Sequence, residues 1–258
     1  MNHNTLGKGS DMNNDKHTEE IVRKKIKALM EQTKKENKNK WSDPDFGPDA
    51  NGDDEYGSKA VYFKGKAPPA VGNNRYPQPN TLRWDRPKWK PKKVDGQPEE
   101  GSTDNDEEED DEEDEYDEYD DDDEYGGGGG GGGSNPWCKK GQLFIGIGAQ
   151  DVKQGKLGDC WFLSALATLA AQPEKIRSCF CVDGDQDDVI LGEKGLWEQC
   201  QQYGIVVCRF MKNFEWYYVI IDDRIPVFDA SGKPVFAHGD DENELWVPLI
   251  EKAYAKLQ

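Results

Sequence analysis

The sequence predicts an α+β fold for the last half of the chain, and three apolar blocks support this prediction. Residues 160–171 are rich in alanine and leucine, which is typical of a buried helix. Residues 205–210 and 215–221 are β-branched and aromatic, and the short link between them suits a β-hairpin. Residues 245–257 place apolar side chains at helical spacing. We therefore expect two helices packed against a small antiparallel sheet.

Prolines set the expected bounds of these elements. Pro173 should end the first helix, because proline has no backbone N–H to continue the ladder. After the hairpin, a further extended stretch is expected over residues 225–228. The last helix should begin near Val247, since Pro248 fits only in a first helical turn.

The negative charge of the chain is concentrated in one short segment. The 258 residues carry a formal net charge of −19, and residues 104–125 contain 18 acidic residues and no basic one. The remainder is close to neutral, which excludes a uniformly acidic globule and a strongly basic nucleic-acid-binding protein. Eight glycines follow at 126–133. Like charges extend a chain and polyglycine resists folding, so we expect residues 104–133 to be a linker before a domain at 134–258.

We expect residues 1–103 to be largely disordered, because the apolar residues concentrate after the linker. One helical pattern stands out, over residues 18–38, where Val22, Ile26 and Met30 share a face. This pattern is typical of a marginal basic surface helix. A helix that binds a protein partner is the alternative.

A second feature of this region is residues 75–93, which mix proline, tryptophan and basic side chains. Proline favours extended backbone, so the segment is consistent with a disordered tail. Trp84 and Trp89 with their flanking cations leave three other readings: docking on an acidic protein partner, on nucleic acid, or on the acidic run of the same chain.

The sequence contains neither an apolar leader at its start nor an apolar run approaching the ~18 residues that span a bilayer. We therefore expect a cytoplasmic location, in which the six cysteines would be mostly reduced. No pair of cysteines has the spacing of a zinc knuckle, so a zinc site is not expected.

The candidate reactive residue is Cys160. Glycines 155 and 158 form a loop that leads directly into the predicted helix, which places Cys160 at the helix N-terminus. There the unpaired N–H groups and the helix dipole favour a thiolate, which is the nucleophilic form of cysteine. Gln154 could add an amide donor for an oxyanion. The alternative is a buried cysteine that packs as a small apolar residue.

The residues around Cys160 resemble the active-site signature of the calpain family of papain-like cysteine proteases. The string is QGKLGDCWFLSALATL, from Gln154 to Leu169. Two further strings match in order, VIIDDRIP at 219–226 and ELWVPLIEKAYAK at 244–256. The resemblance implies that residues 134–258 are the first, helical half of the catalytic domain. It also implies a calcium-dependent cysteine endopeptidase of intracellular limited proteolysis, with Cys160 as nucleophile and Gln154 as oxyanion donor.

The same resemblance implies a Ca²⁺ ion as cofactor. Asp151 and Glu244 match the two acidic ligands of the family's first subdomain, and Gly146 lies near the position that donates a carbonyl. Such oxygen ligands suit Ca²⁺. The alternative for Asp151 and Glu244 is that they are solvated acids or helix caps.

A thiolate protease also needs a base and a group that orients it. In the family a histidine and an asparagine of the second subdomain fill these roles, and the sequence given contains no match to them. His238 is expected to be an exposed or hydrogen-bonded loop residue. We therefore expect this chain alone to be inactive on its protein substrates. A non-catalytic binding, scaffold or regulatory protein of the calpain type is the alternative function.

Overall fold

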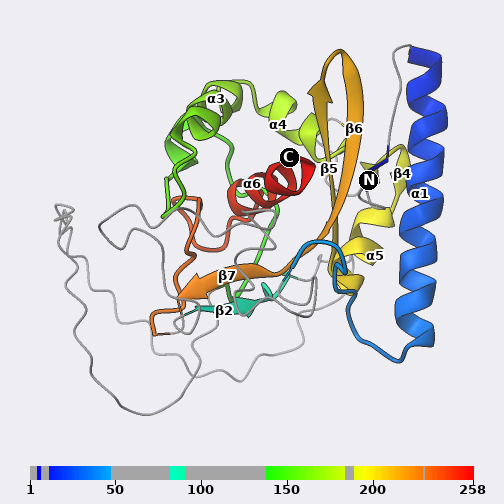
Figure 1. Cartoon of the computed structure of the whole chain (residues 1–258), viewed down its shortest axis with the longest axis horizontal. Helices are drawn as coiled ribbons and strands as arrows, with labels where there is room; N and C mark the ends of the chain where they lie inside the picture. Colours follow the sequence, from blue (N-terminus) through cyan, green and yellow to red (C-terminus); the bar gives the residue numbers. More distant parts are fainter. Residues whose placement is uncertain (1–4, 7–11, 48–81, 91–137, 184–188, 229) are drawn as a thin grey trace, which may run out of the picture. The chain divides into compact units, whose positions relative to one another are not determined.

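A computed structural model describes residues 5–6, 12–47, 82–90, 138–183, 189–228 and 230–258, and Figure 1 shows the arrangement of its elements. The helices are α1 (Met12–Lys35), η2 (Ala149–Asp151), α3 (Cys160–Ala170), α4 (Pro173–Cys179), α5 (Leu196–Tyr203) and α6 (Trp246–Leu257). The strands are β1 (Thr5–Leu6), β2 (Leu82–Asp85), β3 (Val189–Ile190), β4 (Glu193–Lys194), β5 (Ile205–Lys212), β6 (Glu215–Asp222) and β7 (Ile225–Phe228). The mixed helix and strand content agrees with the predicted α+β class.

The β5–β6 hairpin is the centre of the fold. It runs antiparallel over its full length, from the pair Ile205 and Asp222 to the pair Lys212 and Glu215. β1 pairs with the other edge of β6, which gives the strand order β1-β6-β5. Beyond the hairpin, β7 pairs antiparallel with β2, as Figure 1 shows. The hairpin predicted from the β-branched residues is therefore confirmed.

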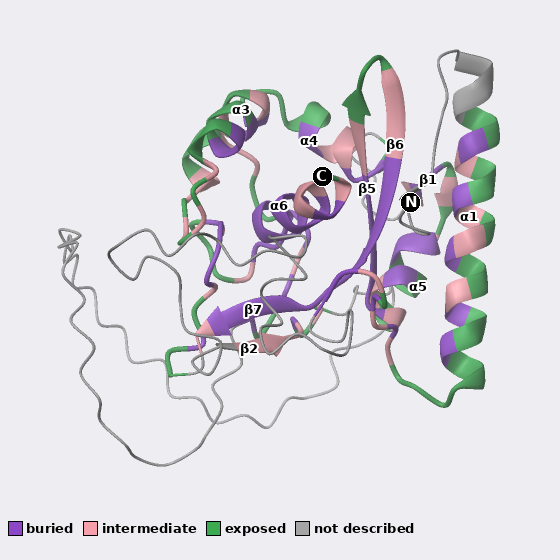
Figure 2. Ribbon diagram, viewed as in Figure 1, coloured by how far each residue is buried: buried purple, intermediate pink, exposed green. Residues whose placement is uncertain are grey.

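Helices cover both sides of this hairpin. α6 contacts β5 and β6 on one side, where α3 and α4 also lie, and α5 contacts β5 on the other side with α1 beyond it (Figure 1). The middle of the hairpin is buried in Figure 2, because apolar side chains of both layers close over it. The fully buried apolar residues of the hairpin are Ile205, Val207, Cys208, Tyr218, Val219, Ile220 and Ile221.

The predicted helices form close to their expected bounds. α3 ends at Ala170, and Pro173 begins α4 as its first residue, so the proline separates two helices. α6 begins at Trp246, one residue before the predicted start, and Pro248 lies in its first turn. Proline is tolerated there because the first N–H groups of a helix have no partner within the helix.

Within residues 1–103, which were expected to be largely disordered apart from a helix at 18–38, the structure describes residues 12–47 and 82–90 as packed on the rest of the chain. The helix expected over 18–38 runs over 12–35, and Val22, Ile26 and Met30 are buried in the core. The apolar face is thus covered within the chain, which removes the basis for a partner-binding helix. Likewise, residues 82–90 pack on residues 138–258 through β2 and Trp89.

The described residues on either side of 91–137 pair with each other. Lys88 donates its backbone N–H to the carbonyl of Cys138 and Lys90 donates to the carbonyl of Gly141, so residues 88–90 and 138–141 lie side by side. Residues before and after it belong to the same compact unit. The predicted linker, 104–133, lies outside the described residues. Its expected role as a linker and domain boundary stays a prediction.

Candidate active site

A short loop positions Cys160, and it is anchored on residues 235–238. The backbone of Lys153 pairs in both directions with His238, and Lys156 donates its N–H to the carbonyl of Val235. Between them, a Cβ atom at Gly155 would lie 2.3 Å from the carbonyl carbon of Phe236. Only glycine allows so close an approach of two backbones. The glycine predicted to form the loop therefore also fixes it in place.

Cys160 is the first residue of α3 and is exposed. The carbonyl of Asp159 accepts the N–H groups of Phe162 at 2.7 Å and Leu163 at 3.1 Å, which closes the first helical turn. The N–H groups at such a terminus point towards incoming negative charge. The predicted placement of the cysteine at the helix N-terminus is therefore confirmed.

The side chain of Gln154 lies in the same loop but is directed elsewhere. Its amide Nε2 donates to the carbonyl of Leu157 at 3.1 Å, and the residue is exposed. No described hydrogen bond joins Gln154 to Cys160. An exposed amide held by one loop carbonyl needs only a side-chain rotation to be freed. The role of Gln154 as oxyanion donor stays a prediction.

Aromatic packing connects α3 to α6. The ring of Phe162 stacks on Tyr254 with centroids 4.3 Å apart. Trp161 meets the same tyrosine edge to face at 5.8 Å, and its side chain is 61% exposed. Offset and edge-to-face contacts of this kind are favourable beyond the apolar area they bury. α6 thus supports the helix that presents Cys160, and Trp161 leaves an exposed aromatic surface next to the thiol.

Two of the three candidate calcium ligands, Gly146 and Asp151, lie in one loop, and Glu244 approaches this loop from just before the start of α6. Glu244 is only 3% exposed, and its Oε1 accepts the N–H groups of Ile145 and Gly146, both at 2.9 Å. Asp151 Oδ2 accepts the N–H of Gly148 at 2.6 Å. Glu244 is therefore not a solvated acid, whereas Asp151 does close the short helix η2, as the capping alternative expected.

The negative charges of Glu244 and Asp151 affect each other. Burial raises the pKa of Glu244, the two backbone N–H groups oppose this, and the negative charge of Asp151 raises the pKa further. The two carboxylates are thus close enough to repel each other. Among the described residues, no group of three or more His, Cys, Asp or Glu side chains forms a metal cluster. A cation here would need backbone carbonyls as additional ligands.

The acid beside Cys160, Asp159, was missed by sequence reasoning. Its Oδ1 atom is buried and has no hydrogen-bond partner, and burial raises the pKa of its carboxyl. A side-chain hydrogen bond with Glu251 of α6 opposes this rise in pKa. Glu251 is itself 2% exposed and also accepts the N–H of Ala237. Only the position of Asp159 next to Cys160 could have drawn attention to it.

The other candidates for a reactive side chain, His238 and four further cysteines, are held by a hydrogen bond or affected by burial. His238 places Nδ1 3.1 Å from the carbonyl of Phe236, which confirms the expectation of a hydrogen-bonded loop histidine. Burial raises the pKa of Cys138 to about 12 and that of Cys179 to about 11. Burial likewise raises the pKa of Cys200 and Cys208 well above the ordinary range. In the described part of the chain, Cys160 is the one cysteine classed as exposed.

Comparison with known proteins agrees with this geometry. Residues 134–258 match the sequence model of the calpain family cysteine proteases. The "Calpain-type cysteine protease ADL1" of Oryza sativa subsp. japonica is 42% identical over 116 residues, which is 45% of this chain and 5% of the relative. The "Calpain-type cysteine protease DEK1" of Arabidopsis thaliana is 43% identical over 116 residues, with the same coverage. Calpain-8 of Homo sapiens is 38% identical over 121 residues, or 46% of this chain and 15% of the relative.

The chain thus spans a small fraction of the length of these relatives. None of its described helices is both long and apolar enough to cross a lipid bilayer. The match includes the loop, the exposed cysteine at the start of α3 and the buried helix α6. Residues 134–258 therefore belong to the calpain family of cysteine proteases.

Proposed function

We propose that this chain supplies the nucleophile-bearing half of a calcium-dependent cysteine endopeptidase that cuts proteins in a limited way. One observation carries the proposal: Cys160 is exposed at the N-terminus of α3, on a loop held against residues 235–238. Protein substrates follow from the protease family. The relatives named above are calpains or calpain-type cysteine proteases, which supports the reaction class.

In the proposed reaction, the Cys160 thiolate attacks the carbonyl carbon of a peptide bond. The developing oxyanion is stabilised by the backbone N–H of Cys160 and by the Gln154 amide, once that amide leaves the carbonyl of Leu157. A base must take the thiol proton and return it to the leaving amine. His238 is held by Phe236 and by the backbone of Lys153, so we assign the base and its orienting group to a second catalytic subdomain.

Calcium is the cofactor we propose for this half. The donor set fits: Asp151 and Glu244 are two carboxylates whose charges repel, and the Gly146 carbonyl would be a third oxygen ligand. A bound cation would neutralise the two acids. Because Glu244 directly precedes the start of α6 and Asp151 precedes the Cys160 loop, the ion would fix these segments relative to each other.

Calcium binding is tested by titration calorimetry on the full chain with Glu244→Gln and, as matched control, Glu242→Gln. Glu242 is an exposed acid two residues away. We expect one Ca²⁺ site that Glu244→Gln weakens at least tenfold and that the control retains. The acidic run at 104–125 adds only weak sites to both variants. Equal affinity in both variants would overturn the calcium assignment.

The nucleophile assignment is tested with a peptide that carries a thiol-reactive group in place of the cleaved bond. We expect it to modify Cys160 faster than a simple alkylating agent of the same reactivity does, and Gln154→Ala to reduce this advantage. Cys179→Ser is the control, because Cys179 is half-buried. Absence of any preference for Cys160 would favour the alternative, a non-catalytic binding, scaffold or regulatory protein.

A further inference from the structure

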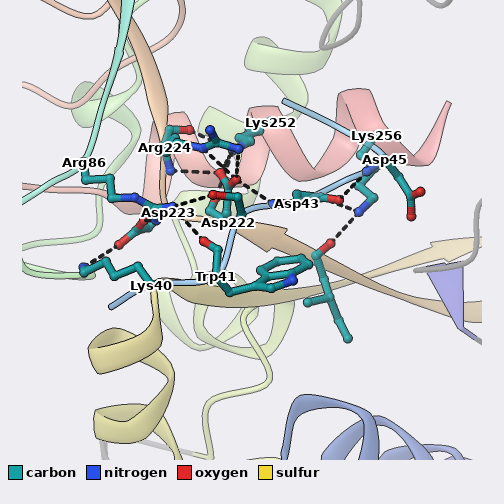
Figure 3. A network of polar contacts seen from close by, with 12 residues as sticks. Lys40, Trp41, Asp43, Asp45, Arg86, Asp222, Asp223, Arg224, Lys252 and Lys256 are labelled. Atoms are coloured by element: carbon teal, nitrogen blue, oxygen red, sulfur yellow. Dashed lines mark hydrogen bonds and ion pairs between the residues drawn. The ribbon is translucent and has the colours of Figure 1, made fainter. Parts of the chain in front are cut away.

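A network of buried charges lies where α6 meets the turn between β6 and β7, and Figure 3 shows it from close by. Lys252 and Lys256 of α6 are fully buried, as are Asp222 at the end of β6 and Asp223 in the turn after it. The Lys252 ammonium donates to Asp222 Oδ1 at 2.6 Å and to the carbonyl of Arg224 at 2.8 Å. We call these five residues the ionic seam, and all of them lie within 134–258: Asp222, Asp223, Arg224, Lys252 and Lys256.

The ionic seam is incomplete without residues from the start of the chain. Lys256 forms its ion pair with Asp43, which is fully buried, and donates to the carbonyl of Ile220 at 2.7 Å. The backbone N–H of Asp43 donates in turn to Asp222 Oδ2 at 2.9 Å. A buried ammonium that loses its carboxylate partner is strongly unfavourable, because nothing replaces its hydration. Asp43 is therefore the counter-ion that allows Lys256 to be buried.

Asp223 depends on the same region even more strongly. Its carboxylate contacts the Arg86 guanidinium, the Lys40 ammonium at 3.0 Å and the Trp89 indole N–H at 3.0 Å, as Figure 3 shows for Arg86 and Lys40. All three groups come from residues 40–90. The Asp223 side chain itself is fully buried. Without residues 40–90, a buried carboxylate would lose these side-chain donors.

Backbone and apolar contacts run along the same boundary. β2 pairs with β7 over four residues, and the N–H of Trp41 donates to the carbonyl of Tyr203 at 2.8 Å. The rings of Trp89 and Trp197 meet edge to face at 5.4 Å. These contacts are of the kind found inside a domain, where ladders, buried charges and apolar side chains occur together.

We propose that residues 12–90 and residues 138–258 are two pieces of a single folding unit, which their non-covalent contacts hold together even when the chain between them is cut. The described residues on either side of 91–137 pair with each other, Lys88 with Cys138 and Lys90 with Gly141. A covalent connection through that segment is therefore not needed to hold the two pieces together. The partner that the ionic seam fits is the N-terminal region of this same chain, with Asp43 and Arg86 as its charged anchors.

The test uses the full chain with the recognition sequence of a specific protease placed inside the glycine run, residues 126–133. After cutting under reducing conditions, we expect both pieces to elute together in size-exclusion chromatography, at the position of the uncut chain. They should remain together in about 1 M salt, since the charges of the ionic seam are buried and weakly screened. Elution as two separate pieces would overturn the proposal.

The contribution of the seam is measured in the same cut protein. We expect Asp43→Asn to raise the dissociation constant of the two pieces at least tenfold, and Glu31→Gln, an exposed acid on α1, to leave it unchanged. If Asp43→Asn does not fold, Arg86→Gln removes a half-buried anchor instead. Dissociation constants equal to that of Glu31→Gln would contradict the proposal. None of these measurements depends on protease activity, so they do not test the proposed function.

Discussion

The two faces of α6 differ sharply, and the difference separates stability from chemistry. Lys252 and Lys256 lie one turn apart and are buried. Lys252 pairs with Asp222, and Lys256 pairs with Asp43. Tyr254 projects about 200° away around the helix and supports Phe162, beside the exposed Trp161. We call the face with Lys252 and Lys256 the closed face, because other parts of the chain cover it. We call the face with Tyr254 the open face, because it contacts the helix that carries the exposed Cys160 and Trp161.

Breaking the closed face should have the largest effect. Lys256→Met leaves Asp43 as a buried carboxylate without its ammonium partner, which should cost about 3–5 kcal/mol of unfolding free energy. Urea denaturation of the full chain, followed by tryptophan fluorescence, measures this cost. Lys24→Met is the matched control, because Lys24 forms an exposed pair with Glu20 on α1. A loss as small as that of the control would mean that the seam does not stabilise the fold.

The second prediction concerns the open face. Tyr254→Ala removes the stack on Phe162 and the contact with Trp161, so we expect a loss of about 1–3 kcal/mol. The urea midpoint should fall less than it does for Lys256→Met. Tyr254→Phe keeps the ring and should be close to wild type. The comparison of faces fails if Tyr254→Ala destabilises the chain as strongly as the buried lysine variant does.

The third prediction is the acid response of the ionic seam. Burial alone would raise the pKa of Asp222, but the charges of Lys252 and Arg224 outweigh it and hold this pKa well below its ordinary range. A lowered folded-state pKa contributes stability above about pH 4 that is lost as the pH falls further, by at most about 1.4 kcal/mol per pH unit. Unfolding free energies measured across this range should fall, and Lys252→Met should reduce the slope. An unchanged slope in that variant would contradict the assignment.

The elements around Cys160 could be predicted from the sequence because their signals are local. The patterns are alanine and leucine over 160–171, the β-branched residues of the hairpin, and Pro248. Each pattern predicts the secondary structure of the segment in which it occurs. The glycines of the Cys160 loop do the same. The roles of Asp151 and Glu244 came only from the resemblance to a family, since their spacing alone does not bring them together.

The ionic seam could not be predicted in this way. Lys252 and Lys256 fall on what resembles a solvated polar stripe of an amphipathic helix. Their burial depends on Asp43, which lies 213 positions before Lys256 and in a region whose composition favours disorder. Composition averages over a segment, whereas one buried ion pair and a few apolar anchors are enough to order it. Trp89 is such an anchor, because its indole N–H reaches Asp223.

The central claim is that the open face presents Cys160 as the reactive thiol, and alkylation of the folded chain by iodoacetamide tests it most directly. Labelling at neutral pH, followed by mass spectrometry of each cysteine peptide, gives a separate rate for every thiol. We predict that Cys160 is modified first and that Cys138 and Cys200 react only on unfolding, because burial raises the pKa of both thiols. Modification of Cys138 or Cys200 as fast as Cys160 in the folded chain would contradict the account.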